Sequence, residues 1–304
     1  MPNPERQRCA QHPGWPPRND EPLSWTEGYE YLCPECDPTY PGLQRHDGQE
    51  NGAHTCIDQV PNCSFSPPGC FGFSVCVANT SKDEADYSLQ LEDQRITDRS
   101  IALLHNASAA ATRATFPNFF LGVGLHKPHV PWLVPREFMD RLPPAEQIPL
   151  AANVHAPTGM PPCAWHPPAD VHGMGGQGFN GTSPPLLSRQ YRRAYAASVS
   201  YQDYNIGRIL ATLKEVGAED STVVSLMGDH ASSTDPTFPA RASTPAESLA
   251  CLQGWQLGDH ATWAKMVNCK CSRFLCVFFR KPQRSGCTVE IGLHVPLIIR
   301  APGL

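Results

Sequence analysis

Apolar residues are concentrated in a few short segments, separated by long polar and proline-rich stretches. The run at 119–124 (FFLGVG) is apolar without alternation, which predicts a strand buried on both faces, as in a parallel sheet. Apolar residues recur with helical spacing over 188–216, and Gly217 is suited to end that helix. The runs 222–227 (TVVSLM) and 294–300 (HVPLIIR) predict two further buried strands.

A shorter helix is predicted at about 95–110. Thr97 is the expected N-cap, and Ile96 and Ile101 are placed for a hydrophobic staple around it. Strands that alternate with helices in this order predict an α/β fold, with a mostly parallel central sheet flanked by helices.

Three stretches depart from this pattern. Residues 1–90 are rich in turn-forming residues and cysteine, so a regular core is not expected there. The stretch 231–253 is rich in Ser, Thr, Pro and Ala, and the stretch 269–288 mixes four cysteines with basic and aromatic residues. Both are expected to be irregular insertions in the α/β domain.

Composition narrows the class of protein. The 304-residue chain has a formal net charge of −5, which argues against a nucleic-acid-binding protein. No stretch approaches the roughly 18 apolar residues of a membrane span, and the N-terminus lacks the apolar run of a signal peptide. Thirteen cysteines favour a lysosomal or secreted setting, although the missing signal peptide points the other way. Four glycosylation sequons also favour that setting: Asn62, Asn79, Asn106 and Asn180.

Two polar motifs directly follow predicted strands, where catalytic groups of open α/β sheets gather. Asp229 and His230 follow 222–227 and suit a Ca²⁺ or Mg²⁺ site, although a helix N-cap beside an exposed histidine is the alternative. His126-Lys127-Pro128-His129 (HKPH) follows 119–124 and could cradle a sulfate or phosphate oxygen. Its alternative is a solvated basic loop.

A third motif is the run 254–265 (GWQLGDHATWAK). Lys265 could bind an anion as a point charge, and Trp255 could form a pocket wall. The alternative is a surface loop whose tryptophans pack inward.

These blocks, in this order, resemble the sulfatase family, in particular its branch that acts on iduronate 2-sulfate. The resemblance covers about residues 12–304, apart from the two insertions, and leaves 1–11 as a leader outside the family pattern. It implies an alkaline-phosphatase-like α/β fold, incomplete in this chain, and hydrolysis of a sulfate ester on a sulfated glycosaminoglycan.

The resemblance also implies roles for individual residues. Asp229 and His230 are similar to a pair in the family's Ca²⁺ site. Lys265 is similar to a lysine that contacts the sulfate and the substrate, and Trp255 to a residue of the substrate pocket. His129, supported by Lys127, is similar to the histidine that protonates the leaving oxygen and contacts the substrate. His12, in HPG, resembles the end of a segment that flanks the nucleophile.

The chain departs from the family pattern at the nucleophile. Family members carry C-x-P/A-S-R, whose cysteine becomes formylglycine, and this motif does not occur in the chain. The run 269–273 (CKCSR) resembles this motif only superficially, because its third residue is cysteine and it lies after Asp229. We therefore expect this chain alone to be inactive, and we expect 1–11, 231–253 and 269–288 to be translated non-coding sequence or disulfide-stapled insertions.

Two other functions stay open. One is another enzyme of the same superfamily, such as an arylsulfatase, a choline-sulfatase-like enzyme that acts on a small sulfate ester, or a phosphonate hydrolase. The other is a catalytically dead protein that binds sulfated glycans through Lys127, His129 and Lys265.

Overall fold

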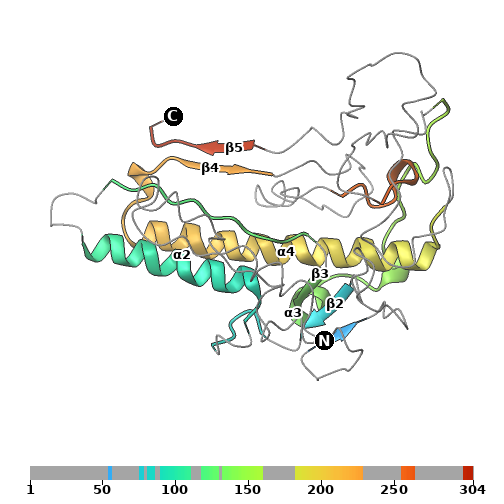
Figure 1. The fold of residues 1–304 in the computed structure, drawn as a ribbon, viewed down its shortest axis with the longest axis horizontal. Coiled ribbons are helices and arrows are strands. Elements are labelled where there is room, and N and C mark those ends of the chain that lie inside the picture. Colours follow the sequence, from blue (N-terminus) through green and yellow to red (C-terminus); the bar gives the residue numbers. More distant parts are fainter. Residues whose placement is uncertain are drawn as a thin grey trace, which may run out of the picture.

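Two helices form the middle layer of the molecule. The computed structural model describes residues 54–56, 75–78, 81–85, 90–110, 118–129, 132–159, 182–228, 255–263 and 297–303. In this part of the chain α2 (Glu92–Ala109) and α4 (Pro185–Glu215) lie side by side (Figure 1). A small sheet lies on one side of the pair and a two-stranded ribbon on the other (Figure 1).

The long helix α4 confirms the helix and the stop predicted from the sequence. Pro185 occupies its first position, where the missing N–H of proline costs no hydrogen bond. At the other end Gly217 has φ 73°, a left-handed conformation that suits glycine. The N–H of Gly217 donates to the Lys214 carbonyl at 3.0 Å, and that of Ala218 donates to the Leu213 carbonyl at 3.1 Å. These two bonds form a Schellman end, which stops the helix.

The shorter helix α2 begins before the predicted start. Its first residue is Glu92, so Thr97 lies inside the helix and its hydroxyl donates to the Asp93 carbonyl at 2.6 Å. The predicted N-cap at Thr97 is therefore wrong, and so is the staple between Ile96 and Ile101.

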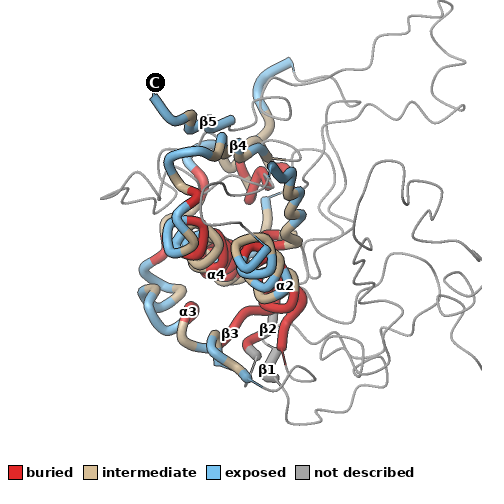
Figure 2. The backbone as a smooth tube through the Cα atoms, turned by 90° about the vertical axis from the view of Figure 1, so that its left-hand side faces the viewer, coloured by how far each residue is buried: buried red, intermediate tan, exposed pale blue. Residues whose placement is uncertain are grey.

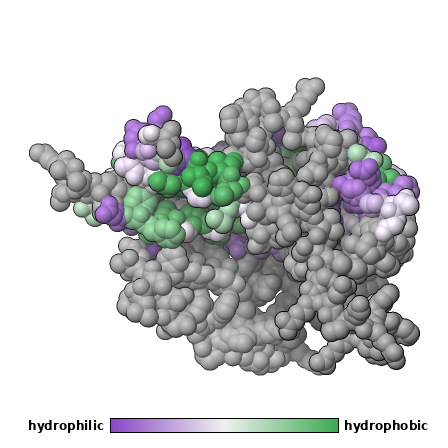
Figure 3. Space-filling model, turned by 90° about the horizontal axis from the view of Figure 1, so that it is seen from above, coloured by the Kyte–Doolittle hydropathy of each residue, from purple (hydrophilic) through white to green (hydrophobic). Residues whose placement is uncertain are grey.

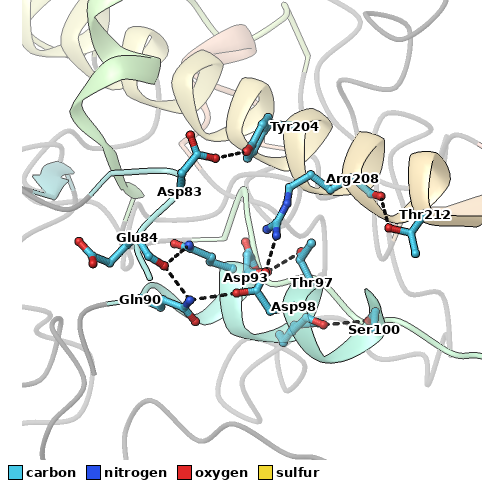
Figure 4. A network of polar contacts seen from close by, with 12 residues as sticks. Asp83, Glu84, Gln90, Asp93, Thr97, Asp98, Ser100, Tyr204, Arg208 and Thr212 are labelled. Carbon is cyan, nitrogen blue, oxygen red and sulfur yellow. Dashed lines mark hydrogen bonds and ion pairs between the residues drawn. The ribbon is translucent and has the colours of Figure 1, made fainter. Parts of the chain in front are cut away.

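Contacts with the segment just before the helix accompany this early start. The side-chain amides of Gln90 and Gln94 both donate to the Glu84 carbonyl, at 2.8 and 2.9 Å (Figure 4). These bonds tie the first turn of α2 to Glu84, and the N-cap residue, Leu91, makes no side-chain capping bond.

The sheet below the helices has the strand order β1-β2-β3, from His54–Cys56, Val75–Ala78 and Trp132–Pro135. β1 pairs with β2 in antiparallel fashion, and β2 pairs with β3 in parallel. All four residues of β3 are buried, because α4 covers the strand and α3 (Arg136–Asp140) follows it directly (Figure 2). Three short 3-10 helices complete the described elements: η2 (Ala145–Gln147), η4 (Glu219–Ser221) and η6 (Asp259–Ala261).

The ribbon above the helices contains β4 (Val224–Met227) and β5 (Leu297–Arg300). Both strands confirm predicted strand positions, but they pair in antiparallel fashion and are not buried on both faces. Met227 is 66% exposed and Ile299 is 61% exposed, and the ribbon lies on the upper side, where Figure 3 shows an apolar patch. The α/β class is confirmed in the described part of the chain. Of the ladders there, however, only β2–β3 is parallel, which differs from the predicted mostly parallel sheet.

The predicted buried strand at 119–124 is wrong. In the described structure this segment forms no strand, and Phe120 is 82% exposed. Leu121 instead packs on a small apolar cluster of α2 and α4 that contains Leu104 and Leu213. The segment runs along the helix pair and packs against it with one side only, so only alternate residues are partly buried (Figure 1).

The core of the molecule lies between β3 and α4 and is strongly aromatic. Its centre is Trp132, which is 0% exposed. Edge-on contacts join the Trp132 ring to Tyr191, Tyr195 and Trp255, with ring centroids 5.6, 6.2 and 5.3 Å away. Aromatic rings bury large areas and favour such edge-to-face contacts, so this cluster supplies much of the packing energy of the described fold.

Candidate active site

The structure describes three of the residues that the sequence singled out, Lys127, His129 and Trp255. The other four, His12, Asp229, His230 and Lys265, lie outside the described residues, and their roles stay predictions.

The loop His126–His129 is a tight turn closed on itself. The N–H of His129 donates to the His126 carbonyl at 3.0 Å, and the Lys127–Pro128 peptide bond is cis. The imidazole rings of His126 and His129 lie 4.7 Å apart between centroids, tilted by 53°. The turn thus places two titratable rings next to each other.

Lys127 lies inside the protein. Its side chain is buried, and its ammonium donates to the His129 carbonyl over a long 3.5 Å. Burial lowers the pKa of Lys127, while the negative charges of Asp93 and Glu92 act in the opposite direction. The alternative of a solvated basic loop therefore does not describe Lys127, whose charge acts on the backbone of His129.

The first turn of α2 binds this loop through hydrogen bonds to its backbone. The Asp93 carboxylate accepts the N–H of His126 at 2.6 Å and the N–H of Lys127 at 2.9 Å. Burial raises the pKa of Asp93, and Lys127 and these two hydrogen bonds oppose that rise. Beside it, a carboxylate oxygen of Glu92 lies 3.5 Å from Nδ1 of His126. Two carboxylates thus anchor the backbone and one ring of the loop.

The second candidate segment, 255–263, has an unusual backbone. Leu257, His260 and Ala261 all have positive φ, between 50° and 61°. Such conformations cost non-glycine residues about 1–2 kcal/mol each, and they persist only where surrounding contacts enforce them. Gly258 also has positive φ, and a Cβ there would lie 3.0 Å from the Trp263 ring.

Contacts on both sides enforce this backbone. The buried guanidinium of Arg192 donates to the Leu257 carbonyl at 3.1 Å. The N–H of His260 donates to the Asn153 carbonyl at 2.5 Å. Trp255 packs inward and is 0% exposed, and its indole nitrogen has no hydrogen-bond partner among the described residues. The segment is thus held by the core and by α4.

Trp132 connects the two candidate segments. Its indole N–H donates to the Pro128 carbonyl at 2.9 Å, and its ring packs edge-on against Trp255. On α4, the Tyr191 ring contacts both Trp132 and Trp263. The HKPH loop and the 255–263 segment are therefore fixed to the same part of the core, although more than 120 residues separate them.

The described residues offer no test of the predicted Ca²⁺ site. They contain no group of three or more His, Cys, Asp or Glu side chains that could hold a metal ion. The expected ligands Asp229 and His230 lie beyond these residues. None of the described helices is long and apolar enough to cross a membrane.

Comparisons with known proteins identify the class. The Sulfatase family model matches residues 48–304, and the chain belongs to the sulfatase family. Human iduronate 2-sulfatase is 33% identical over 219 residues, which cover 70% of this chain and 31% of the human protein. Mouse iduronate 2-sulfatase is 30% identical with the same coverage. The chain thus spans about a third of the length of these curated relatives.

Among solved structures, a phosphonate monoester hydrolase, SpPMH from Silicibacter pomeroyi, is similar to the chain. The TM-score is 0.44 at 24% sequence identity, and the match covers 70% of this chain and 33% of the hydrolase.

Sequence reasoning missed the residues that hold these segments in place. Asp93 and Arg192 lie in helices and make their contacts 34 and 65 residues away along the chain. Trp132 was not distinguished from other apolar residues near the HKPH loop. An acidic first turn on α2 was the available signal, but the predicted helix began after it.

Proposed function

We propose that this chain is part of a sulfuric ester hydrolase and contributes the leaving-group acid and the sulfate-binding cations. The observation that supports this most strongly is the link through Trp132, which ties the HKPH loop and the 255–263 segment to one core. Lys265 follows Trp263 by two residues in the sequence, and the proposal includes it for that reason.

Each residue has a defined task in this proposal. His129 gives a proton to the alcohol oxygen as the S–O bond breaks, since an imidazole is the natural acid at mildly acidic pH. Lys265 binds the sulfate oxygens, and Lys127 holds the His129 backbone. His12 is assigned to the nucleophile's surroundings. Trp255 is assigned to the substrate pocket, whose wall it would support from inside the core, because its side chain is 0% exposed.

Asp229 and His230 are proposed to hold Ca²⁺, which would stabilise negative charge on the sulfate. The proposal leaves the attack on sulfur to a formylglycine, for which this chain carries no C-x-P/A-S-R motif. Residues 1–304 alone are therefore expected to bind a sulfate ester without hydrolysing it.

The proposed substrate is the 2-sulfate of iduronate in heparan or dermatan sulfate. The similarity to iduronate 2-sulfatases over 70% of the chain supports this choice. Thirteen cysteines and four sequons support a lysosomal or secreted location.

A binding experiment tests the proposal. Calorimetric titration of the chain with a heparin disaccharide that carries the 2-sulfate should give saturable binding, and the same disaccharide without that sulfate should bind at least about tenfold more weakly. His129→Ala should weaken binding of the sulfated form only. Equal binding of both disaccharides would contradict the proposal.

Two further ligands separate the alternatives. Stronger binding of a small aryl sulfate than of the disaccharide would indicate a different sulfatase. The other alternative concerns the full-length protein. If that protein lacks C-x-P/A-S-R and binds the disaccharide without hydrolysing it, a glycan-binding protein is indicated. Turnover by residues 1–304 would refute the expected inactivity.

A further inference from the structure

Asp93 is the most buried carboxylate among the described residues, with 1% exposed. Both of its oxygens accept a hydrogen bond, and both donors belong to the HKPH loop, at His126 and Lys127. The acid lies in the first turn of α2, and the two N–H groups follow 33 and 34 residues later.

The stability of α2 does not explain why this carboxylate is buried. An acidic side chain in the first turn favours a helix equally well from the surface, where it stays hydrated. Burial removes that hydration, which is costly for a charged group. Hydrogen bonds from the loop backbone and the positive charge of Lys127 offset this cost, so the burial serves the contact between helix and loop.

The geometry of this contact determines where the loop can lie. Two successive N–H groups on one rigid carboxylate leave the backbone little freedom to rotate. The bond from the His129 N–H to the His126 carbonyl then carries the constraint to His129. Glu92, one residue before Asp93, lies 3.5 Å from the ring of His126.

We infer that Asp93 is a positioning residue of the sulfate-ester site, which fixes the HKPH backbone on α2 and thereby the direction of His129. This inference rests on the proposed function. The competing explanation is that Asp93 only fastens α2 to the rest of the protein.

The variant Asp93→Asn tests the inference against a matched control. Asparagine keeps the shape but offers one acceptor oxygen in place of two, so one loop N–H loses its bond. The control is Asp98→Asn on the same helix, because Asp98 pairs with Arg208 at 2.5 Å and does not contact the loop. Both variants remove one partly or fully buried carboxylate from α2.

Three measurements are made on the 304-residue chain: disaccharide affinity, melting temperature, and the amide NMR signals of His126, Lys127 and His129. Asp93→Asn should weaken binding of the 2-sulfated disaccharide by about tenfold or more, as expected when a charge-assisted hydrogen bond no longer holds a binding group. It should also shift all three amide signals. Asp98→Asn should leave affinity and these signals unchanged, whatever its effect on melting temperature.

Equal losses of affinity in the two variants would overturn the inference, and so would wild-type affinity in Asp93→Asn. If Asp93→Asn does not fold, Asp93→Glu replaces it, since the longer side chain keeps the charge but displaces it. Unchanged affinity in Asp93→Glu would then overturn the inference, and a loss of about tenfold would support it.

A failure of the proposed function would look different. The unmodified chain would then bind no sulfated disaccharide at all. The amide signals, which need no ligand, would still show whether Asp93 fixes the loop.

Discussion

The aromatic core around Trp132 and the ribbon β4–β5 use large apolar side chains in opposite ways. In the core these side chains are almost completely buried and meet edge-on, between a strand and a long helix. In the ribbon Met227, Leu297 and Ile299 are each more than half exposed. Apolar sequence alone therefore does not determine burial; a covering element on the other side is needed as well.

Removing the centre of the aromatic core is the most direct test of this contrast between core and ribbon. Trp132→Ala should destabilise the protein by about 3–5 kcal/mol, because it leaves a large cavity and removes the hydrogen bond to the Pro128 carbonyl. Urea unfolding followed by circular dichroism measures this loss. A cost below about 1 kcal/mol would show that the described core is not the source of stability.

A second prediction concerns the end of α4, where the chain leaves the core for the ribbon. Gly217→Ala should destabilise by about 1 kcal/mol, because φ is 73° there although a Cβ would meet no atom within 4 Å. Gly207→Ala is the matched control inside α4, also with open space around the Cβ. It should stabilise by about 0.5–1 kcal/mol. Thermal melting of the pair should shift in opposite directions, and a shift in the same direction would contradict the helix end described here.

The smallest effect is expected on the ribbon. Ile299→Thr should change the free energy of unfolding by less than about 0.5 kcal/mol, since the side chain is mostly exposed and threonine suits a strand. It should also reduce the fluorescence of a hydrophobic dye bound to the native protein, because it shrinks the apolar patch. A loss of 2 kcal/mol or more would mean that the ribbon is covered in solution.

The sequence predicted those features that depend on local patterns. The helix α4 was found, together with its stop at Gly217, because a long periodic segment and a terminal glycine act locally. The strands β4 and β5 were also found. The burial of these strands and of 119–124 was wrong, since burial depends on which elements cover a segment and an apolar run carries no such information.

The same limit applies to the candidate site. HKPH and GWQLGDHATWAK were identified because unusual residues stand next to each other in the chain. Asp93 and Arg192 were missed because their hydrogen-bond partners lie far from them in sequence. Trp132 was missed because only the fold brings its ring against Tyr191 and Trp255. The early start of α2 was missed for a related reason, since Glu84 holds it through side chains that have no capping pattern.

The helix α4 is about 46 Å long, and it contacts different parts of the protein near its start and farther along. Near its start, Tyr191, Arg192 and Tyr195 hold the two candidate segments, while Arg208 and Leu213 face α2 farther along. Inserting or deleting one residue between Tyr195 and Arg208 would rotate one set of contacts against the other by about 100°. The number of residues in this stretch is therefore constrained by the fold. This holds also for positions that face water, where the identity of the residue can vary.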